Sequence, residues 1–138
     1  GGWCEISDKM SHMNEKIELN QLLTDSKRTR AEQVRIFALL NLGVLESLSH
    51  GMISADDAVT SFFHAENCLF VRRQIRSRTA DELMSRGVQL PDLFDALPAT
   101  TAQREFQREL AQMQALCLTL LEQRLATAEM SRPAIAVR

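Results

Sequence analysis

The chain has 138 residues and a mass of 15.6 kDa, which is the size of one domain and enough to bury a core without a metal ion or a disulfide. Hydrophobic residues make up 45% of it and charged residues 25%, a composition that excludes an intrinsically disordered chain. The net charge of -2 and the pI near 5.9 argue against a dedicated nucleic-acid-binding or membrane-surface protein, because both classes usually carry a large basic excess.

Residues 1–12 follow no periodic pattern, and we expect them to form a flexible lead-in to a helical domain that covers 13–130. A short helix is predicted from residue 13 to about 23. The first strong helix is predicted over about 27–49, where apolar residues follow the 3.6-residue period and cover most of the helix surface. Gly43 inside this helix indicates either the close approach of another helix, which we favour, or a hinge or ligand contact.

The middle of the chain is divided by signals that start and stop helices. Ser54 and Thr79 are predicted N-caps, because their hydroxyl oxygens satisfy free N–H groups and the acidic residues that follow them favour the helix dipole. Gly51 and Gly87 are predicted helix ends, since glycine tolerates the left-handed residue found there, and Pro91 fits a first turn. The helices predicted between these signals cover 54–65, 67–77, 79–86 and 91–97.

The last long helix is predicted over about 101–129, with Thr100 or Thr101 as its N-cap. Its main apolar seam advances in alternating steps of four and three residues, which is typical of a heptad. The seam consists of Phe106, Leu110, Met113, Cys117 and Leu120. The helical pattern is lost after Met130, and residues 131–138 are predicted to be a disordered tail, because Pro133 prevents simple continuation of the helix.

A second apolar stripe on an adjoining face of the last helix contains Leu118, Leu121 and Leu125. Either the short middle helices cover this stripe or a second subunit does, because exposed apolar patches of that size mark interfaces. We expect a homodimer that uses it, since twofold dimers are the commonest closed assembly. No strand-like alternation is present, so the sequence predicts an all-α, single compact domain with two long helices and several short ones between them.

Motifs for hydrolysis, phosphate binding or dinucleotide binding are absent. Carboxylates occur near predicted helix starts, where pairing with the helix dipole explains them better than catalysis does. These carboxylates are Asp56, Asp57, Asp81, Glu82, Asp92 and Asp95. His64 and Cys68 are four residues apart and on a continuous helix would share a face, but a zinc site needs further ligands that the spacing does not supply. We therefore expect no catalytic residues, no metal and no cofactor.

Four arginines, Arg72, Arg73, Arg76 and Arg78, form the densest charge cluster. On a continuous helix Arg72 and Arg76 share one face, and guanidinium groups suit carboxylate or phosphate partners. The simplest interpretation is a solvated face that pairs with local acids such as Glu66, Asp81 and Glu82. Binding of an acidic protein ranks next and binding of nucleic acid after that.

The stretch from Gly51 to Ala58 reads Gly-Met-Ile-Ser-Ala-Asp-Asp-Ala, and a later stretch from Arg86 to Pro98 reads Arg-Gly-Val-Gln-Leu-Pro-Asp-Leu-Phe-Asp-Ala-Leu-Pro. Over about 44–98 the chain resembles a small uncharacterised bacterial protein family that shares this helix start and this helix end. Gln89 and Pro91 replace residues that are usually acidic in that pattern. The resemblance implies a helical fold and no known activity.

The three cysteines, Cys4, Cys68 and Cys117, are widely spaced and odd in number, which favours reduced thiols and a cytoplasmic protein. The chain has no signal-peptide pattern and no apolar run long enough to span a bilayer. We expect a non-enzymatic, cytoplasmic bacterial interaction or regulatory protein, of the adaptor or immunity type, that binds another protein. The alternative is a nucleic-acid-binding regulator that uses the arginine cluster.

Overall fold

The computed structural model describes residues 16–24 and 28–131, with residues 124–131 described by their backbone alone. The described residues are helical and contain no strand, which confirms the predicted all-α class. The helices in chain order are α2 (Leu19–Leu23), α3 (Arg30–Ser49), α4 (Ala55–Ser61), α5 (Ala65–Phe70), the π-helix η1 (Val71–Ile75), α6 (Arg78–Gln89), α7 (Asp92–Ala96) and α8 (Ala99–Ser131). The predicted lead-in over 1–12 lies outside the described residues. Of the predicted tail over 131–138, Ser131 instead ends α8, and residues 132–138 lie outside the described residues.

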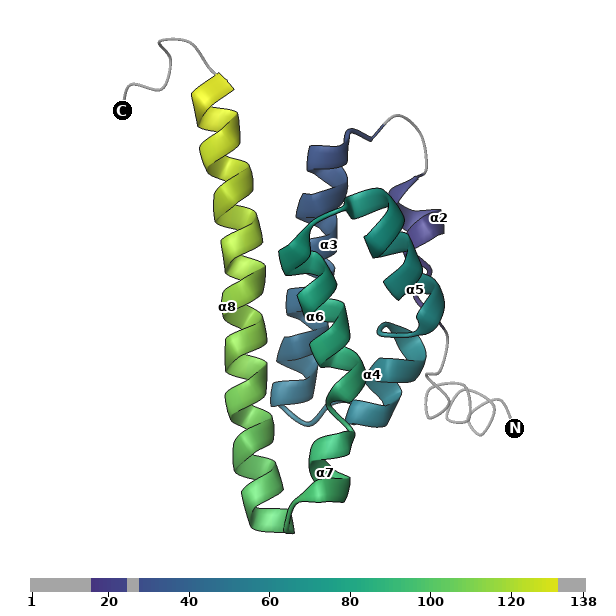
Figure 1. Cartoon of the computed structure of the whole chain (residues 1–138), viewed down its shortest axis with the longest axis vertical. Helices are drawn as coiled ribbons and strands as arrows, with labels where there is room; N and C mark the ends of the chain where they lie inside the picture. The colour runs from purple at the N-terminus through teal and green to yellow at the C-terminus, as the bar shows by residue number, and fades with distance from the viewer. Residues whose placement is uncertain (1–15, 25–27, 132–138) are drawn as a thin grey trace, which may run out of the picture.

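The two long helices, α3 and α8, lie antiparallel and share the most extensive contact in the fold (Figure 1). Gln107 Nε2 donates to the Ser49 carbonyl over 3.4 Å, and Gln114 Nε2 donates to Glu46 Oε2 over 3.5 Å. These two bonds show the register in which the helices run past each other. All five residues of the predicted α8 seam, from Phe106 to Leu120, are buried, so the heptad interpretation is confirmed.

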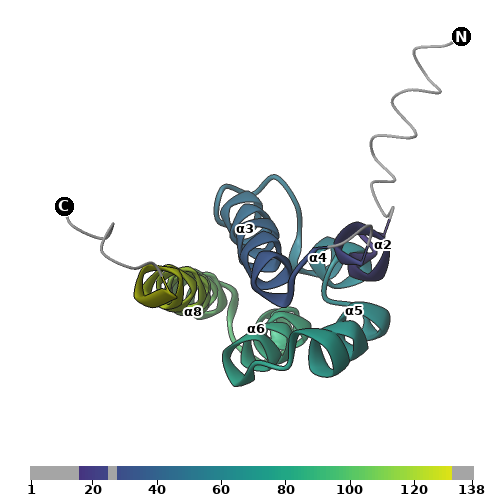
Figure 2. The same ribbon diagram turned by 90° about the horizontal axis from the view of Figure 1, so that it is seen from above.

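The short helices pack on the side of α3 that faces the core, whereas Arg35, Leu39 and Gly43 on its other side are exposed. Viewed along the long helices, α6 lies beside both α3 and α8, whereas α2, α4 and α5 lie on the side away from α8 (Figure 2). Phe37 of α3 stacks on Phe62 with ring centroids 6.4 Å apart, and Phe63 meets Phe62 edge-on at 5.1 Å. These buried rings fill the space between α3, α4 and α6, which is the centre of the core.

Helix starts follow the expected chemistry at some positions and not at others. Ser54 forms the predicted cap of α4, as part of a reciprocal box with Asp57. The predicted cap at Thr79 is wrong, because Ser77 accepts from the Ala80 N–H and α6 begins two residues earlier. The predicted cap at Thr100 or Thr101 is also wrong, since α8 begins at Ala99, directly after Pro98.

The predictions made from glycines are likewise confirmed at one position and wrong at two. Gly51 has φ 71° and follows the end of α3 as predicted, whereas Gly87 lies inside α6 and ends no helix. A Cβ atom at Gly87 would lie 2.3 Å from the Phe63 ring, so close packing of α6 on that ring requires glycine here. The expected close approach at Gly43 is wrong, because that position is exposed and nothing lies within 4 Å of an added Cβ.

Alanine substitutions at these two helical glycines are expected to have opposite effects. Gly43→Ala should raise the free energy of unfolding by about 0.5–1 kcal/mol, because alanine restricts the unfolded chain and meets no neighbour in the helix. Gly87→Ala should lower it by about 1–3 kcal/mol, because the added methyl group overpacks against Phe63. Urea unfolding of the two variants measures both effects, and equal changes in the two would contradict this account of the packing.

Candidate functional site

The predicted arginine cluster lies where η1 meets α6, and we call Arg72, Arg73, Arg76 and Arg78 the arginine corner. Arg76 is left-handed, with φ 55°, and it ends η1. The helix is therefore broken at Arg76, and the expectation that Arg72 and Arg76 share one face of a continuous helix is wrong. The break is held by Arg30 of α3, whose Nε donates to the Ile75 carbonyl over 2.9 Å and whose Nη2 donates to the Arg76 carbonyl over 3.1 Å.

The four arginines of this corner are exposed. Of the acids expected to neutralise them, Glu66 pairs with Lys16 at 3.2 Å and Glu82 pairs with Arg86 at 2.9 Å. No carboxylate oxygen among the described residues lies within 4 Å of a nitrogen of the corner. Arg72 and Arg73 line different shallow clefts, one beside α6 and one beside α2. The corner is thus an exposed positive surface that forms no ion pair with a described carboxylate, although Asp81 lines the same cleft as Arg72.

The second predicted surface is on α8, which lies at the edge of the fold and packs against α3, α6 and α7 (Figure 2). Leu118 is 51% exposed, whereas Leu121 is partly buried against the core. The side chain of Leu125 lies outside the described part of the chain. The short helices therefore do not cover Leu118, although Leu121 belongs partly to the domain's own packing.

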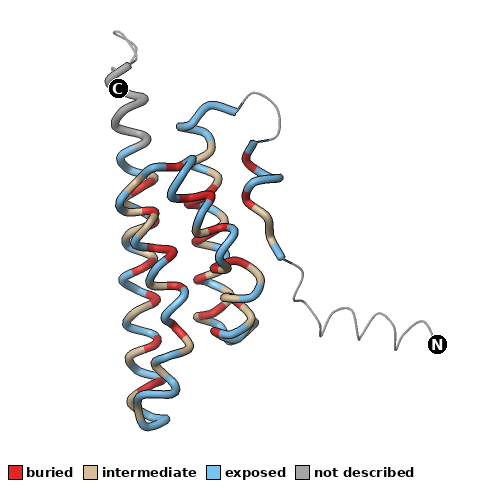
Figure 3. The backbone as a smooth tube through the Cα atoms, turned by 45° about the vertical axis from the view of Figure 1, so that its right-hand side comes forward, coloured by how far each residue is buried: buried red, intermediate tan, exposed pale blue. Residues whose placement is uncertain are grey.

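A stripe of exposed residues runs along the outward face of α8, as the exposed colour along that helix indicates (Figure 3). We call it the outer stripe. It consists of Arg108, Ala111, Ala115, Leu118 and Glu122. Sequence analysis identified only its leucine, because two alanines between opposite charges do not stand out in hydrophobicity. Their heptad spacing, offset from the buried seam, was the signal that could have revealed the stripe.

A cleft of about 580 Å³ lies at the base of the fold, where α3 ends and α4, α7 and α8 begin. We call it the basal cleft. Apolar and polar side chains line it, and Phe94 is 43% exposed with its ring centroid 5.0 Å from that of Phe106. Cys68, Arg86 and Cys117, whose pKa values are raised, lie outside the lining of the basal cleft.

His64 and Cys68 do not form a shared face, because His64 is the N-cap of α5 and not a helical residue. Its Nδ1 accepts from the Asn67 N–H at 3.4 Å, and its Nε2 bonds the Ile17 carbonyl at 3.1 Å. Within the described residues no group of three or more His, Cys, Asp or Glu side chains is arranged to hold a metal. The histidine instead belongs to a contact that holds the segment before α2.

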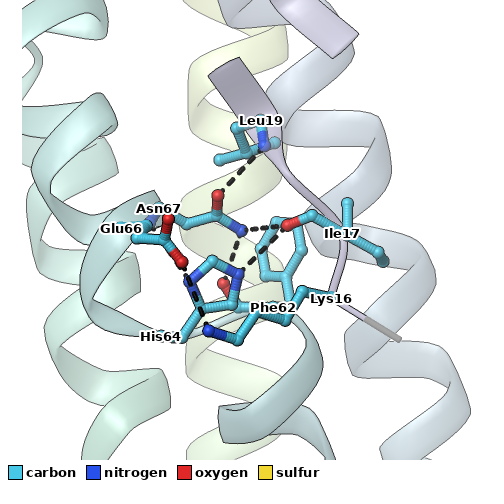
Figure 4. Close-up of polar contacts among 7 residues, drawn as sticks. All are labelled: Lys16, Ile17, Leu19, Phe62, His64, Glu66 and Asn67. Atoms are coloured by element: carbon cyan, nitrogen blue, oxygen red, sulfur yellow. Dashed lines mark hydrogen bonds and ion pairs between the residues drawn. The ribbon is translucent and has the colours of Figure 1, made fainter. Parts of the chain in front are cut away.

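Asn67 is the centre of that contact (Figure 4). Its side chain is buried, donates to the carbonyls of Ile17 at 2.7 Å and Phe62 at 2.8 Å, and accepts from the Leu19 N–H at 3.0 Å. Because all three bonds go to main-chain atoms, Asn67 fixes the path of the backbone while Leu19 and Leu23 enter the core. Sequence analysis missed this residue, since an isolated asparagine carries no local signal.

Asn67→Ala is expected to lower the free energy of unfolding by about 2–3 kcal/mol, because it removes the buried hydrogen bonds to the Leu19 N–H and the Phe62 carbonyl and one of the two bonds to the Ile17 carbonyl. Asn20→Ala is the matched control, since Asn20 is an exposed asparagine of α2. Chemical denaturation measures both variants. Equal stabilities for the two would show that the buried carboxamide does not hold the segment.

Burial controls the reactivity of the cysteines. It raises the pKa of the Cys117 thiol to about 12. Burial also raises the pKa of Cys68, where Arg72 acts in the opposite direction and Asp81 acts with burial. Both thiols are unpaired, and Cys4 lies outside the described residues. A buried thiol of this kind behaves as a small apolar group.

Native Cys117 should resist alkylation by iodoacetamide at pH 8 and react only after denaturation, because the thiolate is the reactive form. In the unfolded chain the thiol titrates near about 8.5. The stability that comes from burying the neutral thiol is therefore complete below that pH. It is lost as the pH rises toward the pKa of about 12 that the thiol has in the folded protein. Peptide mass spectrometry after labelling tests this, and rapid labelling of Cys117 in the folded protein would contradict it.

The positive charge of Arg86 is paired with two glutamates. It bridges α6 and α8 through Glu82 at 2.9 Å and Glu109 at 2.8 Å, and it also donates to Gln112 Oε1 at 3.1 Å. Hydrogen bonds to Glu109 and Glu82 raise its pKa above the usual value for arginine. The arginine corner consequently does not extend along α6 to this position.

Comparison with known proteins gives a family but no activity. The family model described as Protein of unknown function (DUF3969) matches residues 28–133. The chain belongs to this family. The match includes and extends the 44–98 segment in which the sequence resembles an uncharacterised family. No curated protein and no solved structure matches the chain. Within the described residues, none of the helices has the length and apolar character needed to cross a bilayer.

Proposed function

We propose that this member of the family is a non-catalytic protein-interaction domain, of the adaptor or immunity type, which associates with a second copy through the outer stripe of α8. The composition of that stripe supports the proposal most strongly. It combines an exposed leucine and two small alanines with an arginine at one end and a glutamate at the other. Such a surface is apolar at its centre and polar at its ends, as protein interfaces commonly are.

The stripe is complementary to itself when two copies are related by a twofold axis. An antiparallel pair centred on Ala115 places Arg108 of one copy level with Glu122 of the other, because each residue lies seven positions from the centre. The short alanine side chains allow the two helix axes to approach, and Leu118 then packs across the partner helix. The contact of Arg108 with Glu105 in the same chain is exposed and 3.7 Å long, so it competes only weakly with a pair between Arg108 and Glu122 of the second copy.

Leu118→Asp is expected to abolish the dimer without reducing helix content, because the side chain is half exposed and the change removes the apolar centre of the interface. Light scattering at micromolar concentration should give twice 15.6 kDa for the unchanged chain and 15.6 kDa for the variant. Val88→Asp is the control, since Val88 is a similarly exposed apolar residue, 42% accessible, on α6. It should leave the dimer intact.

Charge reversal tests the antiparallel register separately. Arg108→Glu alone should weaken association, and Arg108→Glu combined with Glu122→Arg should restore it, because the exchanged charges again face each other. An unchanged chain that remains at 15.6 kDa on concentration would overturn the dimer. Association that is equally strong in the unchanged chain and in the charge-reversed variants at Arg108 and Glu122 would overturn the antiparallel arrangement.

A second candidate function is binding of an acidic protein at the arginine corner. Its support is that the four guanidinium groups are exposed and have no carboxylate partner among the described residues. Unpaired arginines suit carboxylate clusters through forked hydrogen bonds. Nucleic acid is a weaker candidate partner for the same surface, because the chain as a whole is acidic and no aromatic residue separates the arginines.

Arg72→Glu combined with Arg76→Glu should abolish binding to polyglutamate, and binding by the unchanged chain should weaken as salt rises. Titration calorimetry with polyglutamate and with a short DNA duplex distinguishes an acidic protein from nucleic acid as the partner. Arg104→Glu, at an exposed position on α8, is the control for reversal of an arginine outside the corner. Retained polyglutamate binding by the double variant would exclude the corner, and tighter binding to DNA than to polyglutamate would favour the nucleic-acid alternative.

We also propose a cytoplasmic location. Its support is chemical: unpaired thiols at Cys68 and Cys117 suit a reducing compartment.

A further inference from the structure

The lining of the basal cleft combines apolar and polar side chains. Leu48, Ile53 and Phe94 are among the apolar ones, and two exposed aspartates, Asp56 and Asp95, make part of the lining acidic. Neither aspartate has an ion pair within 4 Å among the described residues. A fitting occupant therefore combines apolar side chains with positive charge and has no acidic residue.

One segment of this chain has that chemistry. Residues 132–138 read Arg-Pro-Ala-Ile-Ala-Val-Arg, with two cations and no acid. They follow α8 directly and lie beyond the described residues. Proline at 133 disfavours a further helical turn, and the isoleucine and valine are of a size that suits a cleft lined by Leu48 and Phe94.

The segment cannot reach the cleft of its own chain. Gln103, which lines the cleft, and Ser131, which ends α8, are separated by about 42 Å of helix at a rise of about 1.5 Å per residue. Seven extended residues span at most about 24 Å. Any occupancy of the cleft by residues 132–138 therefore involves a second copy.

The antiparallel dimer of the proposed function supplies that second copy in the required position. Ala115 is the midpoint of α8, because it lies sixteen residues from both Ala99 and Ser131. In the dimer, Ser131 of the second copy consequently lies level with Ala99, beside α7 and the cleft. Neighbouring helix axes are about 8–10 Å apart, a distance that the seven residues easily cross.

We propose that residues 132–138 of each copy occupy the basal cleft of the other, with the apolar residues inside and the arginines at Asp56 and Asp95. This inference rests on the proposed dimer. The exchange is reciprocal, so the dimer gains two identical contacts outside the α8 pair. It also gives the cleft a defined ligand, a short basic and apolar peptide segment.

Cysteine cross-linking between two full-length variants tests the proposal. One carries Gln103→Cys and the other Ala136→Cys, both with Cys4→Ser and Cys68→Ser, while the buried Cys117 is retained. Mild oxidation of the mixture should give a disulfide-linked species of twice 15.6 kDa, and neither variant alone should give it in comparable yield. Ser85→Cys in place of Gln103→Cys is the matched control, because Ser85 is exposed on α6 away from the cleft.

The outcomes separate this inference from the dimer itself. Light scattering that shows a dimer, together with no preference for position 103 over position 85, overturns the tail contact and leaves the dimer standing. A monomer by light scattering overturns both. Circular dichroism of each variant shows that helix content is unchanged, so that a loss of cross-linking is not a loss of folding.

Charge supplies a second test of the same contact. Asp56→Asn with Asp95→Asn in the Gln103→Cys chain should remove most of the cross-linked product, and the loss should be mimicked by Arg132→Gln with Arg138→Gln in the other chain. Ile135→Asp should also abolish the product, because it places a charge against the apolar side chains of the cleft. Unchanged yields in all three variants would overturn the proposed recognition.

Discussion

The antiparallel pairing of α3 and α8 is the interaction on which the rest of the fold depends. The seam of α8, from Phe106 to Leu120, is buried against α3 and α6, and each buried side chain of this size contributes about 1.5–3 kcal/mol. Once the two long helices lie together, the chain between them must fold back across α3 within the length of α4 to α7. The same pairing directs one face of α8 outward and leaves the basal cleft at the end where α3 stops.

The core on the α3 side has one polar exception. Asn41 is fully buried in α3, and neither atom of its carboxamide has a hydrogen-bond partner among the described residues. An unsatisfied buried amide costs about 1–3 kcal/mol, so the apolar contacts around it must offset that cost. Asn67 shows the opposite case, because its three hydrogen bonds make a buried asparagine an anchor for the backbone.

Much of the fold could be predicted from sequence because helices are encoded locally. The 3.6-residue period identified α3 and α8, and the Ser54 and Gly51 signals marked real helix boundaries. Gly87 and Gly43 were interpreted wrongly because the local sequence does not show whether a glycine ends a helix, allows a close contact or lies on an open surface. The Phe63 ring beside Gly87 and the open space beside Gly43 are seen only in the folded structure.

The candidate surfaces were harder to predict for the same reason. The arginines of the corner were visible as a cluster, but they are separated by a π-helix and the left-handed Arg76. The carbonyls at this break accept hydrogen bonds from Arg30, which is far away in the sequence. Leu118 was visible on α8, but its exposure depends on where α3 and α6 pack. The basal cleft is made by four helices, and no local pattern of residues describes it.

The contact at Asn67 has a consequence for the order in which the molecule is built. Leu19 bonds to a side chain 48 residues further along, and Ile17 bonds to one 50 residues further along. During synthesis, at about 5–20 residues per second, α2 therefore leaves the ribosome well before Asn67 has been made. Leu19 and Leu23 stay exposed to solvent throughout that interval. α2 therefore reaches its place in the fold only after α5 has been made, and a chaperone that binds apolar segments has an opportunity in that interval.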